Sequence, residues 1–143
     1  MSFSRTCFAL AASLLSVAAS AADYGNYGGK GGMTAYSIKP NVYEYHFDKG
    51  FVGPDAGGWD PNLQYAWSRI AGATVCGVPV SLEKMLPLLI KKFEQDELTH
   101  KMIGIDFHAA QMRANKKFCT DERIAEISAA IPKFESGDFP AKF

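Results

Sequence analysis

The sequence has few cysteines and no Cys-x-x-Cys pair. Its three cysteines are Cys7, Cys76 and Cys119, and no histidine lies at a metal-ligand spacing from Cys76 or Cys119. Structural zinc sites use paired cysteines and histidines, and c-type haem attachment needs Cys-x-x-Cys-His, so neither site is expected. The chain also lacks an apolar run long enough to span a bilayer. We therefore expect no membrane span.

The chain also has no formal net charge at pH 7. The chain has 15 basic and 15 acidic side chains, which gives a formal net charge of zero at pH 7. Nucleic-acid-binding domains carry a basic face, so this class of partner is not expected. About half of the residues are apolar (48%) and about a fifth are charged (21%), which is typical of a globular domain.

Catalytic motifs are missing too. There is no Gly-x-Ser-x-Gly sequence, and the glycines between Gly25 and Gly32 are not followed by a helix start, as a phosphate-binding loop requires. The acidic pairs Asp96-Glu97 and Asp121-Glu122 suit exposed helix starts better than a glycosidase cleft. We predict that the protein is not an enzyme and that it holds no cofactor.

The N-terminal stretch 1–21 is typical of a secretory signal peptide. Arg5 precedes a short apolar run from Phe8 to Ala19, and Ala19-Ser20-Ala21 supplies the small side chains that a signal peptidase reads. This pattern predicts export, to the periplasm or to the medium. Cys7 is removed with the leader.

Export decides how the remaining cysteines are interpreted. Cys76 and Cys119 form an even pair in an oxidising compartment, where a disulfide is the default state. The bond would close a loop of about 43 residues. Chain entropy gives such a loop about 4 kcal/mol of stabilisation as an upper figure.

The mature chain divides into an arm, residues 22–58, and a helical domain, residues 59–143. The arm begins with glycines and tyrosines that have no apolar periodicity. From Val42 to Asp48 aromatic and polar residues then alternate, which is the period of a β-strand. With a turn at Pro40-Asn41, this pattern predicts an extended or β-hairpin arm.

The helical domain has clear boundaries. Asp60-Pro61 is a strong helix start, and Gly77 ends that helix just after Cys76. Ser81 begins the next segment, where Pro87 either splits the helix, which then restarts, or bends one helix that runs through; the split is the favoured interpretation.

A long helix is expected from about Asp96 to Phe118, and Thr120 caps a last helix that Pro132 ends. The tail 135–143 is expected to be loose, or pinned by Phe134 or Phe139. The predicted fold is mainly α, a four-helix orthogonal or bundle-like domain with one disulfide. The predicted buried stripe of the long helix is Leu98, Met102, Ile105, Ala109, Met112 and Cys119.

Five of the six tyrosines precede Asn62, and exposed tyrosines can form a face for a partner protein. For Tyr43 and Tyr45, covering the helical core is the favoured interpretation, whereas Tyr24 and Tyr27, beside glycines, are expected to be exposed. Trp59 can either line a pocket or fill the core. The candidate binding residues are Tyr24, Tyr27, Tyr36, Tyr43, Tyr45 and Trp59.

A metal interpretation depends on His108 and Met112, four positions apart on the long helix, which offer an imidazole and a thioether to a soft copper ion. Both positions lie on or beside the predicted buried stripe, so core packing is the favoured explanation for both. The sequence therefore predicts no metal site, and a copper carrier is kept as a hypothesis.

Without a catalytic set, binding is the expected role. We predict an exported inhibitor-like or immunity-like protein that docks another protein through the tyrosine-rich arm. The layout of an exported helical domain with one disulfide resembles that of periplasmic acid-stress chaperones and of secretion-system immunity proteins, in build and compartment only. An acid-stress chaperone is the alternative, because the chain becomes strongly positive below about pH 4 as its carboxylates are protonated.

Overall fold

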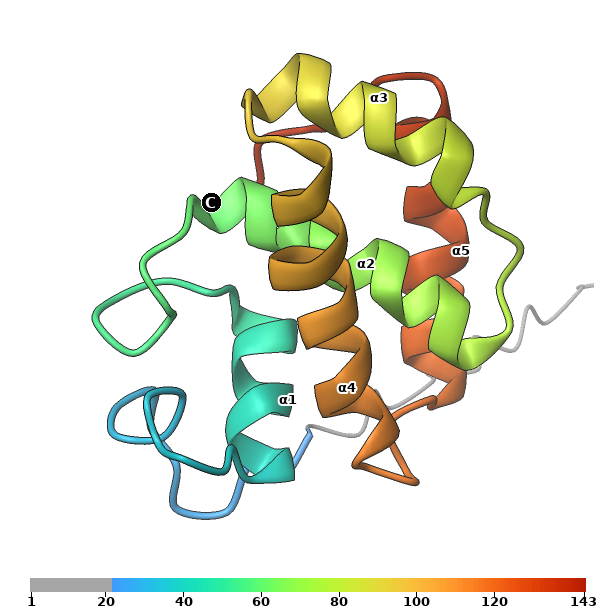
Figure 1. Cartoon of the computed structure of the whole chain (residues 1–143). Helices are drawn as coiled ribbons and strands as arrows, with labels where there is room; N and C mark the ends of the chain where they lie inside the picture. The colour runs from blue at the N-terminus through green and yellow to red at the C-terminus, as the bar shows by residue number, and fades with distance from the viewer. Residues whose placement is uncertain (1–21) are drawn as a thin grey trace, which may run out of the picture.

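The computed structural model describes residues 22–143, and the predicted leader, residues 1–21, lies outside them. This part of the chain is mainly helical, as predicted, and contains no strand (Figure 1). None of its helices is both long and apolar enough to cross a bilayer. The elements are α1 (Pro40–Lys49), α2 (Pro61–Cys76), α3 (Leu82–Phe93), the π-helix η1 (Thr99–Asp106), α4 (Phe107–Arg113) and α5 (Asp121–Glu135).

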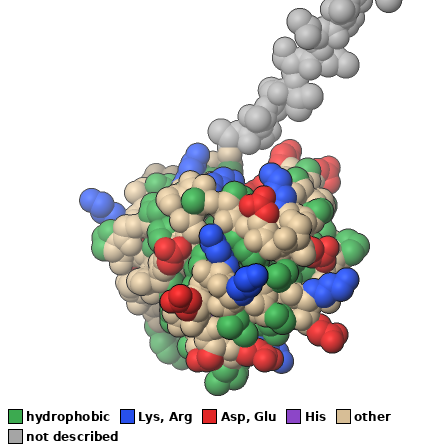
Figure 2. Space-filling view, turned by 90° about the horizontal axis from the view of Figure 1, so that it is seen from above, with side chains coloured by type: hydrophobic (Ala, Val, Ile, Leu, Met, Phe, Trp, Pro, Cys, Tyr) green, Lys and Arg blue, Asp and Glu red, His purple; other side chains and the backbone are tan. Residues whose placement is uncertain are grey.

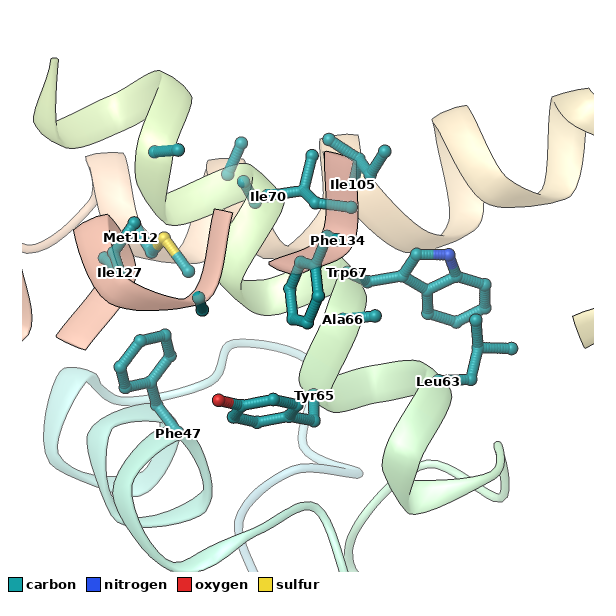
Figure 3. Close-up of a cluster of buried hydrophobic side chains, with 14 of the residues drawn as sticks. Phe47, Leu63, Tyr65, Ala66, Trp67, Ile70, Ile105, Met112, Ile127 and Phe134 are labelled. Carbon is teal, nitrogen blue, oxygen red and sulfur yellow. The ribbon is translucent and has the colours of Figure 1, made fainter. Parts of the chain in front are cut away.

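Helix α2 runs through the middle of the fold, between α5 on one side and η1 and α4 on the other (Figure 1). It begins as predicted, because the Asp60 carboxylate accepts hydrogen bonds from the main-chain N–H groups of Asn62 (2.8 Å) and Leu63 (3.0 Å), as a helix N-cap does. Gly77 ends it in the left-handed conformation, with φ of 74°, which is a common helix C-terminus. Trp67 is 1% exposed, and Figure 3 shows it in a core that draws side chains from several helices.

The predicted disulfide is present. Cys76 at the end of α2 is bonded to Cys119, and their Cα atoms are 5.5 Å apart. The expected long helix ends at Arg113, however, so Cys119 lies in the connection before α5 and not on a helical stripe. The bond thus joins the end of α2 to the start of α5.

The extended interpretation of Val42–Asp48 is wrong, because this segment lies inside helix α1. The residues of this segment fit both the two-residue period of a strand and the 3.6-residue period of a helix. Tyr43 and Phe47 alternate with polar residues, but they are also four positions apart on a helix. Pro40 occupies the first helical position, which favours a helix start. Burial decides the outcome, because the helix places Tyr43 and Phe47 in the core at 2% and 0% exposure.

The predicted buried stripe of the long helix is only partly correct. Ile105, Ala109 and Met112 are buried as expected, whereas Leu98 is 64% and Met102 57% exposed. The cause is the π-helical stretch η1, in which each hydrogen bond reaches one position further along the chain and each turn is wider. The wider turns shift the buried face away from Leu98 and Met102.

The favoured break at Pro87 and the predicted helix end at Pro132 are both wrong, because α3 and α5 continue through these prolines. Helix α3 continues through Pro87, which lies on its exposed side, so the helix neither stops nor restarts there. A missing hydrogen bond costs less on that side because water satisfies the free carbonyl group. Of the two outcomes expected for the tail, the structure shows the pinned one, since Phe139 is 7% exposed and stacks on Phe134 with ring centroids 5.0 Å apart.

Candidate functional site

An apolar hollow of about 260 Å³ opens beside η1. Its polar side chain, Gln64, donates a hydrogen bond to the carbonyl oxygen of Ala56 and is therefore already engaged within the protein. The remaining side chains of the wall are apolar, so the hollow favours an apolar occupant. It is lined by Met33, Ala56, Gly57, Trp59, Gln64, Ile103 and Phe107.

Exposed apolar side chains continue from this hollow along η1. Ile103 belongs to the wall and is 51% exposed; Met102 beside it is 57% exposed, and Leu98 one turn earlier is 64% exposed. Single exposed apolar residues are ordinary, but three that share one end of a helix and adjoin an apolar hollow indicate an interaction site. We call Leu98, Met102 and Ile103 the η1 apolar face.

The sequence left open whether Trp59 and Trp67 line a pocket or fill the core, and the structure separates them. Trp67 is buried and donates its indole N–H to Nδ1 of His100 over 3.0 Å. Trp59 is half-buried, packs edge-on against Trp67 with ring centroids 5.4 Å apart, and forms part of the hollow's wall. Trp59 is thus a candidate binding residue that lines this hollow, whereas Tyr27 lines another hollow, of about 380 Å³, formed by the arm and the start of α1.

The five candidate tyrosines do not form one face. Tyr36 is fully exposed, and Tyr43 is buried at 2% exposure, so Tyr43 belongs to the core as the favoured interpretation had it. Tyr24 and Tyr27 are half-buried rather than exposed, and both rings pack edge-on against Tyr45 at 5.3 and 5.2 Å. Their packing holds the arm against α1.

Asp55 anchors this arm. Its buried carboxylate accepts hydrogen bonds from the Tyr27 hydroxyl (2.7 Å) and from the main-chain N–H groups of Gly32 (2.7 Å) and Met33 (3.1 Å). The hydrogen bond from Tyr27, followed by that from Met33, lowers the pKa of Asp55 to about 2, because both bonds favour the charged carboxylate. Asp55 is therefore ionised at neutral pH and fixes Met33, which lines the hollow.

Two histidines are buried with aromatic partners. His108 Nδ1 lies 2.8 Å from the Tyr43 hydroxyl. Burial lowers the pKa of His108 to about 3, with the Arg69 charge adding to the shift, since both disfavour a charged ring. Burial also lowers the pKa of His100. Both rings are therefore neutral at pH 7. Among the described residues, the Nε2 atoms of His100 and His108 have no hydrogen-bond partner.

The copper hypothesis involves one of these rings. His108 and Met112 are 0% and 1% exposed, so both lie inside the core. In residues 22–143 no group of three or more histidine, cysteine, aspartate or glutamate side chains is arranged to hold a metal ion. The copper carrier stays a hypothesis, and the His108 position requires the core to open before an ion can enter.

Two buried arginines were missed in the sequence. Arg69 is 2% exposed and pairs with Glu126 at 2.8 Å. Its guanidinium lies over the rings of Phe47 (3.8 Å) and Tyr65 (4.4 Å), where the ring faces attract a cation. Arg123 pairs with Asp48 on α1 at 2.8 Å. These arginines tie α2 and α5 to α1, so their role is structural.

The η1 apolar face was also missed. Leu98 and Met102 were assigned to the core, and Ile103 received no role. The available signal was the run Met102-Ile103-Gly104-Ile105, which is wider than one helical stripe and so requires either a fully buried helix or an exposed apolar face. No protein-family model matches the chain, and no curated protein or solved structure shows significant similarity to it.

Proposed function

We propose that the protein is an exported, non-enzymatic binding protein that docks an amphipathic helix of a partner protein at the hollow and the η1 apolar face. One observation carries the proposal: the apolar hollow beside Trp59 has the half-exposed Ile103 in its wall, and Met102 and Leu98, next to Ile103 and one turn earlier, are exposed as well. Such a surface is costly to leave in water, and a partner that covers it recovers that cost.

The shape of the surface favours a helix as the occupant. Leu98 and Met102 are separated by about one helical turn, and Ile103 and Phe107 continue the line into the hollow. An amphipathic helix presents anchors at the same helical spacing, and its largest apolar side chain would enter the hollow. Acidic and basic side chains are interspersed on the face of the molecule shown in Figure 2.

The predicted oxidising compartment and the lack of catalytic motifs in the sequence both fit this proposal. The disulfide between Cys76 and Cys119 suits an oxidising compartment, and the predicted leader directs the chain there. The proposal of a non-enzymatic role depends on the sequence, which lacks a nucleophile, base and orienting set. An inhibitor or immunity protein of the periplasm combines these properties.

The test begins with a photo-crosslinking amino acid at position 103 of the exported protein in its native host. The crosslinked partner is identified, and its contact segment is titrated as a purified peptide by calorimetry. Ile103→Asp is expected to weaken binding at least about tenfold, because it introduces a charge that cannot be desolvated in an apolar contact. Circular dichroism should show an unchanged fold, since Ile103 is half exposed.

Ile90→Asp is the matched control, because Ile90 is also exposed (37%) but lies on α3 and does not line the hollow. It should bind the peptide as the native protein does. Equal affinity of the native protein and the Ile103→Asp variant would overturn the proposal, as would a crosslinked segment that is not helical when bound.

The acid-stress chaperone is the second candidate, favoured by the buried neutral ring of His108. In acid this ring must become charged inside the core, which destabilises the fold and exposes apolar helix faces. Suppression of client aggregation at pH 3, but not at pH 7, is the expected result. No suppression at pH 3 rules this function out.

A further inference from the structure

The Tyr27 hydroxyl stands between two groups that both contact it. Its oxygen lies 2.7 Å from Asp55 Oδ2 and 2.8 Å from His46 Nε2. Burial and the hydrogen bond to Asp55 raise the pKa of Tyr27, so the hydroxyl keeps its single proton. An ionised carboxylate only accepts hydrogen bonds, and Tyr27 therefore donates to Asp55. The contact with His46 must then run the other way, with Nε2 donating to the tyrosine oxygen.

The second ring nitrogen of His46 leads to the same conclusion. Nδ1 lies 3.2 Å from the carbonyl oxygen of Gly50, and a carbonyl oxygen accepts hydrogen bonds but cannot donate them. Nδ1 therefore also carries a proton. With protons on both nitrogens, His46 is an imidazolium, and the sequence Asp55⁻, Tyr27, His46⁺ is a buried ion pair bridged by a hydroxyl. His46 and Asp55 are only 1% and 4% exposed.

We call His46, Tyr27 and Asp55 the relay. Its three residues come from separate segments of the chain. Tyr27 comes from the glycine-rich arm, His46 from α1, and Asp55 from the loop between α1 and α2. The same Asp55 carboxylate holds the main-chain N–H groups of Gly32 and Met33, and Met33 is part of the hollow's wall. Ala56 and Gly57, the next residues of the loop, form another part of that wall. Asp55 thus connects His46, through Tyr27, to both parts of the hollow's wall.

We infer that the His46–Tyr27–Asp55 relay is a pH-sensitive latch that assembles the hollow while His46 is protonated and releases the arm when His46 loses a proton. The inference rests on the proposed function, because it assigns regulation to that docking site. The latch itself is a property of the free protein and is measured without a partner.

Loss of the proton removes one hydrogen bond that nothing else replaces. A neutral His46 has only one ring proton, so it can donate to the Gly50 carbonyl oxygen or to the Tyr27 oxygen but not to both. The Asp55 carboxylate also loses its buried counter-charge. The arm has few other anchors of this strength; one is the hydrogen bond from the Tyr24 hydroxyl to Asp48 (2.8 Å).

His46 is surrounded by groups from the arm, the loop after α1, α1 itself and α4. The titratable groups that face its ring are Tyr27 from the arm, Asp55 from the loop and Tyr45 from α1, and Phe51 stacks on the ring at 5.9 Å. Behind Phe51, its ring 4.9 Å away, lies His108 of α4, which is neutral down to its pKa of about 3. The pKa of Tyr27 is raised and that of Asp55 is lowered to about 2, so neither of these two groups changes its charge between about pH 5 and 9.

The experiment uses the whole mature chain and two NMR readouts from about pH 5 to about pH 9. The ¹⁵N shifts of the His46 ring report its charge, and amide exchange of Gly32 and Met33, corrected for the intrinsic rate at each pH, reports the latch. Protection of these amides is expected to fall about tenfold or more as His46 becomes neutral, the fold-change for losing one charge-assisted hydrogen bond. Protection of core amides in α2 should not change.

Two variants isolate the relay. Tyr27→Phe removes the bridging hydroxyl and should leave Gly32 and Met33 weakly protected at every pH. Tyr24→Phe is the matched control, because it removes another arm hydrogen bond but leaves the relay intact. It should lower protection without changing its dependence on pH.

A neutral His46 ring at pH 5, or protection of Gly32 and Met33 that does not follow the charge of His46, overturns the latch. The result is independent of docking. If Ile103→Asp binds the partner normally while protection follows the charge of His46, the docking proposal fails and the latch stands. If amide protection does not change with the charge of His46 while Ile103→Asp abolishes binding, the latch is overturned and the docking proposal stands.

Discussion

Gly104 of η1 lies against the indole ring of Trp67 on α2, so closely that a β-carbon at position 104 would overlap the ring. Trp67 is 1% exposed and is fixed by its hydrogen bond to His100, so it cannot swing aside. This contact sets the distance between η1 and the central helix. It also holds Ile103, the preceding residue, at the edge of the hollow.

The first prediction concerns this contact. Gly104→Ala should lower the free energy of unfolding by about 2–3 kcal/mol, because the added methyl group overpacks a filled core. Denaturant unfolding followed by circular dichroism measures the change. Gly28→Ala is the control, since no atom lies within 4 Å of its β-position. For this open surface site the expected change is at most about 0.5 kcal/mol. Equal stability of the two variants would contradict the packing argument.

The disulfide provides the second prediction. Replacing both Cys76 and Cys119 with serine should lower the free energy of unfolding by roughly 3–4 kcal/mol. The reason is that the unfolded chain regains the freedom of the loop between two cysteines 43 positions apart. Urea unfolding of the variant and of the oxidised protein gives the difference. The oxidised protein with and without a reducing agent should reproduce it. Two free thiols in protein isolated from its host would contradict the bond.

The third prediction concerns acid. The pKa of His108 is about 3 in the folded protein, below the ordinary value of 6.5, so the folded state binds fewer protons than the unfolded state between these limits. Its contribution to stability is therefore complete above about pH 6.5 and is lost as the pH falls towards 3. The loss is on the order of 4–5 kcal/mol.

Urea unfolding at a series of pH values measures this slope. In His108→Asn the side-chain oxygen can still accept the hydrogen bond from Tyr43, but it does not titrate. The variant should be less stable at pH 7 and should lose less stability between pH 6.5 and 3 than the native protein does. Parallel slopes would show that other groups cause the acid sensitivity.

The fourth prediction compares two partners of Glu126. Arg69 is buried and pairs with it at 2.8 Å, whereas Lys142 is 48% exposed and lies 3.5 Å away. Arg69→Ala should cost about 3–5 kcal/mol, because it removes a buried charge pair and the stacking on Phe47. Lys142→Ala should cost less than about 1 kcal/mol, since exposed pairs contribute little. Thermal unfolding of both variants checks the contrast, and similar losses would contradict it.

Local signals predicted the parts of the fold that depend on neighbouring residues. Asp60 and Thr120 cap α2 and α5 where expected, with Thr120 accepting a hydrogen bond from the Arg123 N–H over 3.3 Å. These caps need only residues within one helical turn, so a sequence pattern contains them completely. The Tyr24 and Tyr27 interpretation failed because their hydrogen-bond partners, Asp48 and Asp55, are 24 and 28 positions away in the chain.

The sequence by itself determined the helical class, the cysteine pairing, both ends of α2 and the start of α5. Only the tertiary structure decided that Val42–Asp48 is helical, that α5 continues beyond Pro132, that η1 turns Leu98 and Met102 outwards, and that Trp59 lines the hollow beside η1. A segment that fits two periods adopts the one that buries more apolar surface, and that choice depends on partners far away in the chain. Trp67 against Gly104 is such a partner, and no local pattern records it.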